Sequence, residues 1–169
     1  MSLSEMLLPE FDQEMATTRK ILERVPEGKS DWQPHGKSMT LGRLAGHVAE
    51  LAGWGVVTMA QTELDFMPAG GPPYKPTIFT SRAEALELFD KNVKASREAI
   101  AKANDPDFKV MWSLKRAGQT LVSMPRYSVL RSMVLNHIIH HRAQLGVFLR
   151  LNDVAIPGSY GPSADEPRF

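Results

Sequence analysis

Residues 134–148 read VLNHIIHHRAQLGVF and contain three of the five histidines in the chain. On a helix at about 100° per residue, His137 and His141 lie about 40° apart, one turn above the other. Their Cβ atoms are then about 5–6 Å apart, close enough for both imidazoles to bind one metal ion. Apolar residues share this face, which predicts that both imidazoles point into the core. These apolar residues are Leu130, Val134, Leu145 and Phe148.

A third histidine, His47, comes from a separate predicted helix that reads LGRLAGHVAELAGW, residues 41–54. It lies at the edge of an apolar face formed by Leu44, Leu51 and Trp54. A single buried histidine is more often a hydrogen-bonded core residue than a metal ligand. The HxxxH pair alone leaves both interpretations open, because the glutamate of the helical zincin motif is missing. Three inward histidines on two helices favour a metal site.

The composition is typical of one globular domain spanning residues 1–169, with 43% hydrophobic and 23% charged residues. The 20 basic and 19 acidic side chains are spread along the chain, so neither a nucleic acid nor a membrane surface is expected as a partner. The absence of cysteine excludes disulfides and thiolate ligands. The N-terminal stretch MSLSEMLLPEFDQEM does not resemble a signal peptide, and no apolar run is long enough to span a membrane. A cytoplasmic location is expected.

Apolar periodicity predicts an all-α fold with four helices. Ser2 with Glu5 forms a capping-box pattern at the first, and Thr40 is a plausible N-cap for the second. The predicted helices span about residues 2–25, 40–64, 82–103 and 126–152.

The segments between these helices differ in character. Residues 67–76, MPAGGPPYKP, are a long connection and a candidate rim or lid over the site. The stretch before the last helix reads as a short hairpin with its turn at Ala117 and Gly118. The tail, residues 153–169, is expected to be extended and surface-lying, with the alternatives that it folds across the site or onto a partner chain.

The last predicted helix has a second apolar face formed by Leu135, Ile139 and Leu149. A helix that is apolar on two sides is buried on two sides, which predicts a homodimer interface. Arg131 and Arg142 lie away from the histidine edge and are expected in solvent or at that interface. The connector after the first helix holds His35, expected at the surface, and Trp32, expected to pack over the bundle end.

Three blocks of this chain resemble the DinB/YfiT-like family. They are WQPHGKSMTLGRLAGHVAEL (residues 32–51), MPRYSVLRSMVLNHIIHHRAQLGVFLRLNDVAIP (residues 124–157) and YGPSAD (residues 160–165). The chain departs from the family at Gly36, where proline is usual. The resemblance implies an antiparallel four-helix bundle, with a long crossover connection, that binds one divalent metal and forms a homodimer.

The resemblance also carries the family's histidine triad onto His47, His137 and His141. His140 lies about 100° from His141 on the helix and is left outside the first coordination shell. Glu50, Gln144 and His140 are candidates to support the ligands from behind, because metal-bound imidazoles usually donate their second N–H to an oxygen. The alternative for Glu50 and Gln144 is an ordinary polar residue on a helix surface.

Three imidazoles suit zinc or nickel first, with iron, cobalt, manganese or copper also possible. Three protein ligands leave a coordination position open, which favours a metal-dependent enzyme acting on a small-molecule substrate. The resemblance implies thiol S-transfer to an electrophile, and metal-assisted hydrolysis is the other reaction that such a site permits. No residue is identified as nucleophile or general base. The alternatives are a non-catalytic stress protein with a structural metal, and a helical interaction module.

Overall fold

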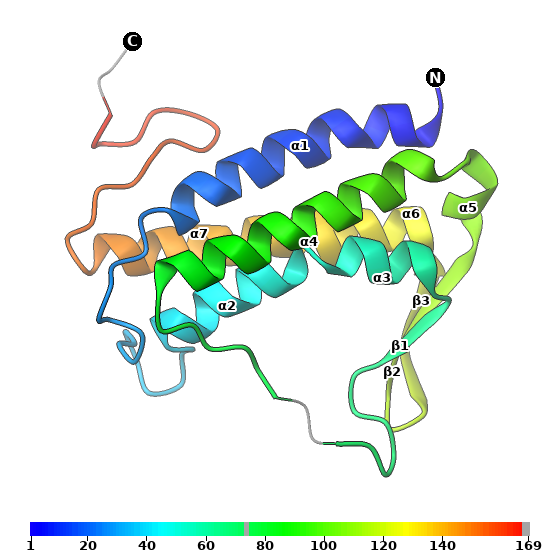
Figure 1. Ribbon diagram of the computed structural model, residues 1–169, viewed down its shortest axis with the longest axis horizontal. Helices are drawn as coiled ribbons and strands as arrows, with labels where there is room; N and C mark the ends of the chain where they lie inside the picture. Colours follow the sequence, from blue (N-terminus) through cyan, green and yellow to red (C-terminus); the bar gives the residue numbers. More distant parts are fainter. Residues whose placement is uncertain (73–74, 167–169) are drawn as a thin grey trace.

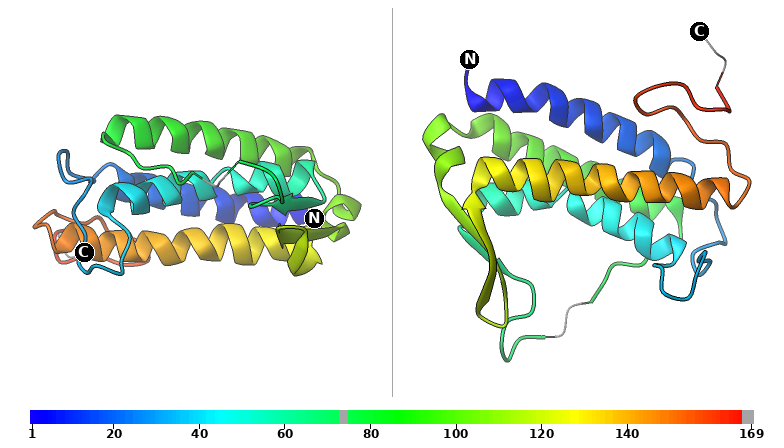
Figure 2. Two further views of the ribbon diagram at one scale, coloured as in Figure 1. Left: turned by 90° about the horizontal axis from the view of Figure 1, so that it is seen from below. Right: turned by 180° about the vertical axis from the view of Figure 1, so that it is seen from behind.

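The computed structural model describes residues 1–72 and 75–166. Long helices run side by side along the molecule, and a small sheet packs at one end (Figures 1 and 2). The helical elements are α1 (Leu3–Leu22), α2 (Leu41–Leu51), α3 (Trp54–Ala60), α4 (Arg82–Lys102), α5 (Asp105–Lys109), α6 (Arg126–Val129), the π-helical segment η1 (Leu130–Leu135) and α7 (Asn136–Arg150). The strands are β1 (Glu63–Asp65), β2 (Met111–Arg116) and β3 (Gln119–Pro125).

The prediction of an all-α fold is wrong in one respect, because the chain also forms a three-stranded mixed sheet. β2 pairs with β3 in antiparallel register, and β1 pairs with β2 in parallel register. The predicted hairpin is confirmed. Its turn residues Ala117 and Gly118 both have positive φ, 51° and 79°, as a tight hairpin turn requires. The added strand β1 gives the hairpin a third partner, since a two-stranded ribbon alone is marginal.

The predicted helix over residues 40–64 is interrupted, and its end forms β1 instead. Ser96 of α4 causes the break. Its hydroxyl donates to the carbonyl of Ala52 at 2.6 Å and accepts from the amide of Val56 at 3.0 Å, so it inserts between two groups that would pair in a continuous helix. Gly55 makes room for this insertion, because a Cβ there would lie 2.7 Å from that of Ser96. The sequence shows the glycine but not the serine that uses it.

The last helical region is also less regular than predicted, because η1 separates α6 from α7. The wider π turn changes the direction of side chains before and after it, but His137 and His141 both lie in regular α7. Leu135 and Leu149, predicted to face a partner, are 1% and 0% exposed within the single chain. The homodimer therefore stays a prediction, without support from this face.

Arg142 was expected in solvent or at an interface, and that expectation is wrong. Its side chain is 3% exposed and pairs with the buried Glu14 of α1 at 2.7 Å. Tyr160 of the tail accepts from Arg142 and donates to Glu14, each at 2.8 Å. The tail is thereby held beside the C-terminal half of α1 (Figure 1). Arg131 is half-exposed and pairs with Glu10.

The ends of the helices and the connector follow the sequence closely. The capping box of Ser2 and Glu5 and the Thr40 cap are confirmed. Trp32 packs edge-on against Phe148 with ring centroids 5.5 Å apart, as expected of a residue covering the bundle end. His35 is exposed, as predicted. No helix within the described residues is long and apolar enough to cross a membrane.

The role of Ser96 can be tested by Ser96→Ala. The substitution leaves the carbonyl of Ala52 and the amide of Val56 buried without a partner, so the free energy of unfolding should fall by about 1–3 kcal/mol. Urea denaturation measures the change. Ser132→Ala is the control, because that hydroxyl is exposed and its contacts, with the carbonyl of Ser128 and the sulfur of Met124, lie at the surface. Equal stability of the two variants would contradict the assignment.

Candidate metal centre

The three predicted histidines meet where α2 packs against α7. His47 comes from α2, and His137 and His141 come from consecutive turns of α7. The ring centroids are 5.2 Å apart for His47 and His137, 4.6 Å for His47 and His141, and 4.7 Å for His137 and His141. One potential ligand atom from each ring lies within 4.8 Å of the others. His141 is 8% exposed, so at least one ring is enclosed by the fold.

This spacing fits a metal ion after a small movement of the rings. Zinc–nitrogen bonds are about 2.0–2.1 Å long, so two nitrogens on one ion can be no more than about 4.2 Å apart. A tetrahedral ion holds its nitrogens about 3.4 Å apart, so the widest separation here, up to 4.8 Å, needs a closure of about 1.4 Å. The donor set of three imidazoles is one that divalent transition metals accept.

His140 does not belong to this group. Its side chain is exposed, and its ring packs edge-on against His141 with centroids 4.8 Å apart. The 100° step between consecutive helical residues turns it out of the α2–α7 contact. His140 is therefore an exposed histidine that directly precedes His141 in the sequence. Substituting it provides a control for substitutions of the three clustered histidines.

Gln144 supports His141 as the spacing along α7 suggested. The Nδ1 atom of His141 lies 2.7 Å from the side-chain oxygen of Gln144. An amide oxygen only accepts, so Nδ1 carries the proton and Nε2 keeps its lone pair. Burial lowers the pKa of His141 to about 4, with further lowering by His47 and His137, although the contact with Gln144 raises it. The ring is neutral at pH 7, as a metal ligand must be.

The backbone carbonyl of Met133, one turn before His137, raises the pKa of that ring. Burial is the main cause of its lowered pKa, the charge of a protonated His47 adds to it, and the contact with Met133 opposes it. Sequence reasoning missed this partner. A carbonyl four residues earlier on a helix is available at every position, so no residue type marks it.

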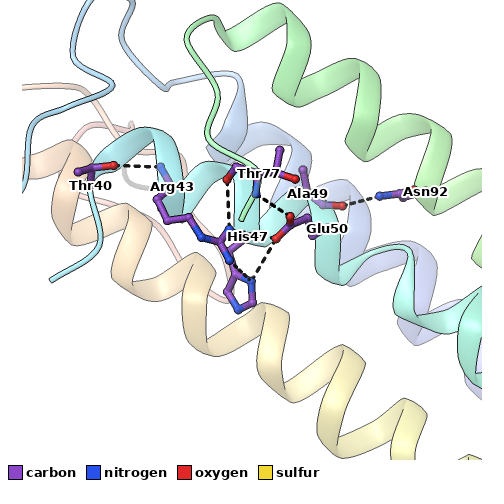
Figure 3. Close-up of polar contacts among 7 residues, drawn as sticks. All are labelled: Thr40, Arg43, His47, Ala49, Glu50, Thr77 and Asn92. Carbon is purple, nitrogen blue, oxygen red and sulfur yellow. Dashed lines mark hydrogen bonds and ion pairs between the residues drawn. The ribbon is translucent and has the colours of Figure 1, made fainter. Parts of the chain in front are cut away.

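Glu50 lies behind His47 and is held from three sides (Figure 3). Its Oε2 is 3.0 Å from Nη1 of Arg43 and 3.6 Å from Nδ1 of His47, and its Oε1 accepts from the amide of Thr77 at 3.0 Å. Burial is the largest single influence and raises the pKa of Glu50, but the contacts with His47, Thr77 and Arg43 outweigh it and bring the pKa to about 2. Glu50 is therefore ionised, and its carboxylate lies beside Nδ1 of His47, which Nη2 of Arg43 also approaches, at 3.4 Å. Arg43 and Thr77 were missed from the sequence.

A cavity of about 420 Å³ borders the ring of His141. It lies between the connector that precedes α2 and the C-terminal half of α7. Its walls are formed by Lys37, Ser38, Met39, Leu44, His141, Gln144, Val147 and Phe148. Neither the tail nor the segment 67–76 is among these residues. Within that segment, residues 73 and 74 lie outside the described part of the chain, so its role as a rim stays a prediction.

The pH dependence of the metal-free protein follows from His141 and His137. Because their pKa values are lowered on folding, the unfolded chain binds more protons than the folded chain between about pH 4 and the ordinary histidine pKa near 6.5. Stability is complete above about pH 6.5 and falls as the pH drops towards 4. Urea unfolding with a chelator at pH 7 and pH 5 should show this loss, and His141→Gln should reduce it. An unchanged loss in His141→Gln would contradict the explanation.

A model of the DinB superfamily matches residues 10–145 of this chain. The uncharacterised protein YrdA of Bacillus subtilis (strain 168) is 28% identical over 160 residues, covering 94% of this chain and 89% of that protein. A DinB-like protein from Bacillus cereus ATCC 10987 has a TM-score of 0.69 at 23% identity, covering 90% of this chain and 95% of that one. The DinB-like protein YjoA of Bacillus subtilis has a TM-score of 0.67 at 12% identity, covering 91% and 96%. The two solved structures share the fold, and the match to the family model over most of the chain shows that the protein belongs to the DinB superfamily.

Proposed function

We propose that this protein binds one divalent transition metal through His47, His137 and His141 and uses it to act on a small molecule. The observation that carries the proposal is the convergence of three imidazoles whose ligand atoms lie within 4.8 Å of one another. Zinc and nickel are the metals expected first, and iron, cobalt, manganese and copper also accept imidazole ligands. Three protein ligands leave room for a further ligand, which is the pattern of catalytic rather than closed structural sites.

The cavity beside His141 supports an enzyme. Its volume of about 420 Å³ lies within the range of about 300–1,000 Å³ that small-molecule sites occupy. Its walls combine apolar surfaces from Leu44 and Phe148 with the amide of Gln144 and the ammonium group of Lys37. Within the described part of the chain, no acidic side chain lines it. This lining suits a substrate with an apolar body and a negative charge.

The reaction we propose is thiol S-transfer to an electrophile. Metal-assisted hydrolysis is the alternative reaction that the same metal site would permit. When bound, a divalent metal supplies a Lewis-acidic centre for a sulfur or oxygen atom. Burial favours the neutral rings of His137 and His141. Gln144 orients His141 from the outside, and Glu50 lies beside His47.

A second candidate function is a structural metal without turnover. The observation in its favour is that the triad joins α2 to α7, so that an ion there would link two helices. The two functions differ in what metal removal does to the fold. A structural site makes the metal-free chain unstable, whereas a catalytic site leaves it folded and inactive.

The metal site is tested by mass spectrometry of metal content and by zinc titration of the untagged protein. We expect one metal per chain in the wild type. His137→Ala should weaken zinc binding by more than about 100-fold, because loss of a supporting partner alone typically costs about 10–100-fold. His140→Ala is the matched control and should bind as the wild type does. Equal zinc affinity in both variants, or no zinc uptake by folded wild type, would sink the proposal.

Catalysis is tested by screening the metal-loaded protein against thiol–electrophile pairs and activated esters. We expect turnover in the loaded wild type, and none in the metal-free protein or in His47→Ala. Thermal unfolding with and without chelator runs beside the screen. A metal-dependent fold with no turnover would establish the structural alternative instead.

A further inference from the structure

An extended segment after the long connection crosses the outer face of α2. We call residues 77–80 the strap. The amide of Phe79 donates to the carbonyl of Gly42 at 3.3 Å, and its carbonyl accepts from the hydroxyl of Ser30. The amide of Gly42 in turn donates to the carbonyl of Ser30 at 2.9 Å. The strap is therefore fixed at one end to the start of α2 by backbone hydrogen bonds.

Two glycines one turn apart on α2 allow this close approach. A Cβ at Gly42 would lie 2.5 Å from the carbonyl oxygen of Phe79, and one at Gly46 would lie well inside 3.0 Å of the carbonyl oxygen of Thr77. Real Cβ atoms essentially never come so near to backbone oxygen. Any side chain at these positions would lift the strap from the helix. The glycines that weaken α2 as a helix are thus explained by the segment that lies on them.

The strap reaches the histidine site through Glu50. The amide of Thr77 donates to Oε1 of Glu50 at 3.0 Å, and the carbonyl of Thr77 accepts from Nη1 of Arg43 at 3.2 Å (Figure 3). The same Nη1 donates to Oε2 of Glu50 at 3.0 Å. One backbone unit of the strap therefore holds both a carboxylate and the guanidinium that pairs with it.

Two groups compete for the outer nitrogen of His47. Nδ1 lies 3.6 Å from Oε2 of Glu50, which can only accept, and 3.4 Å from Nη2 of Arg43, which can only donate. If Glu50 has the contact, Nδ1 carries the proton and Nε2 keeps the lone pair that a metal needs. If Arg43 has it, the proton moves to Nε2 and the ring must change tautomer before it can bind metal.

We infer that the strap is a positioning element for the proposed metal site: by holding Glu50 and Arg43 behind His47, it decides which of the two contacts Nδ1, and so which ring nitrogen is left for a metal. Glu50 is the positioning residue through which it acts, and Gly46 is the residue that lets it approach. The inference rests on the proposed metal site.

The tautomer of His47 can be read directly by long-range ¹H–¹⁵N correlation NMR on the metal-free protein above pH 7. We expect the same ratio of Nδ1–H to Nε2–H at His47 in the wild type and in Gly146→Ala. The latter is the control, a helical glycine with nothing within 4 Å of an added Cβ. Gly46→Ala should change this ratio, because the strap then no longer holds Glu50 and Arg43 in place. Glu50→Gln should do the same, because its amide oxygen takes the Thr77 donor and its NH₂ group turns towards Nδ1. A Gly46→Ala spectrum in which the His47 ratio is unchanged from wild type would overturn the inference.

Zinc titration of the same proteins gives a second readout. Gly46→Ala and Glu50→Gln should each weaken zinc binding by at least about tenfold, as loss of a supporting partner does. The double variant should lose no more than Glu50→Gln alone, because both changes act through one carboxylate. Additive losses would show that the strap acts by another route.

Equal zinc affinity of the wild type and Gly46→Ala would overturn this inference alone. A folded wild type that takes up no zinc would overturn the proposed metal site as well. Should Gly46→Ala not fold, Glu50→Gln decides the tautomer question alone.

Discussion

The constraint on which this structure depends is the enclosure of three imidazoles between α2 and α7. Each ring has two nitrogens, and a buried nitrogen without a partner destabilises the fold. On their outer sides, His47 lies beside Glu50 and Arg43, and His141 lies beside the side-chain oxygen of Gln144. One potential ligand atom of each ring lies within 4.8 Å of the others, a spacing that a shared cation would explain.

Much of the surrounding fold can be understood as keeping α2 in place against α7. The hydroxyl of Ser96 bonds the carbonyl of Ala52 and the amide of Val56, and so separates α2 from α3. The glycines of α2 admit the strap on its outer side, where the strap holds Glu50. On the far side of α7, the buried pair of Arg142 and Glu14 ties that helix to α1.

The sequence was sufficient for features that depend on neighbours along the chain. The spacing of His137 and His141 within one helix, the caps at Ser2 and Thr40, and the Ala117–Gly118 turn all follow from local geometry, and all are found. Features that depend on distant parts of the chain were missed. The break after Leu51 needs Ser96, whose hydroxyl bonds the carbonyl of Ala52, 44 residues earlier. Arg142 looked like a surface residue because its partners Glu14 and Tyr160 lie far off in the sequence. Thr77 contributes through its backbone, which no side-chain pattern can reveal.

The most direct test of this account is X-ray absorption at the zinc edge of the zinc-loaded protein, because it counts the imidazoles around the ion. The account predicts three imidazole nitrogens at about 2.0–2.1 Å and at least one further light ligand. A shell with fewer than three imidazoles would contradict the assignment of His47, His137 and His141 as the ligands of one metal.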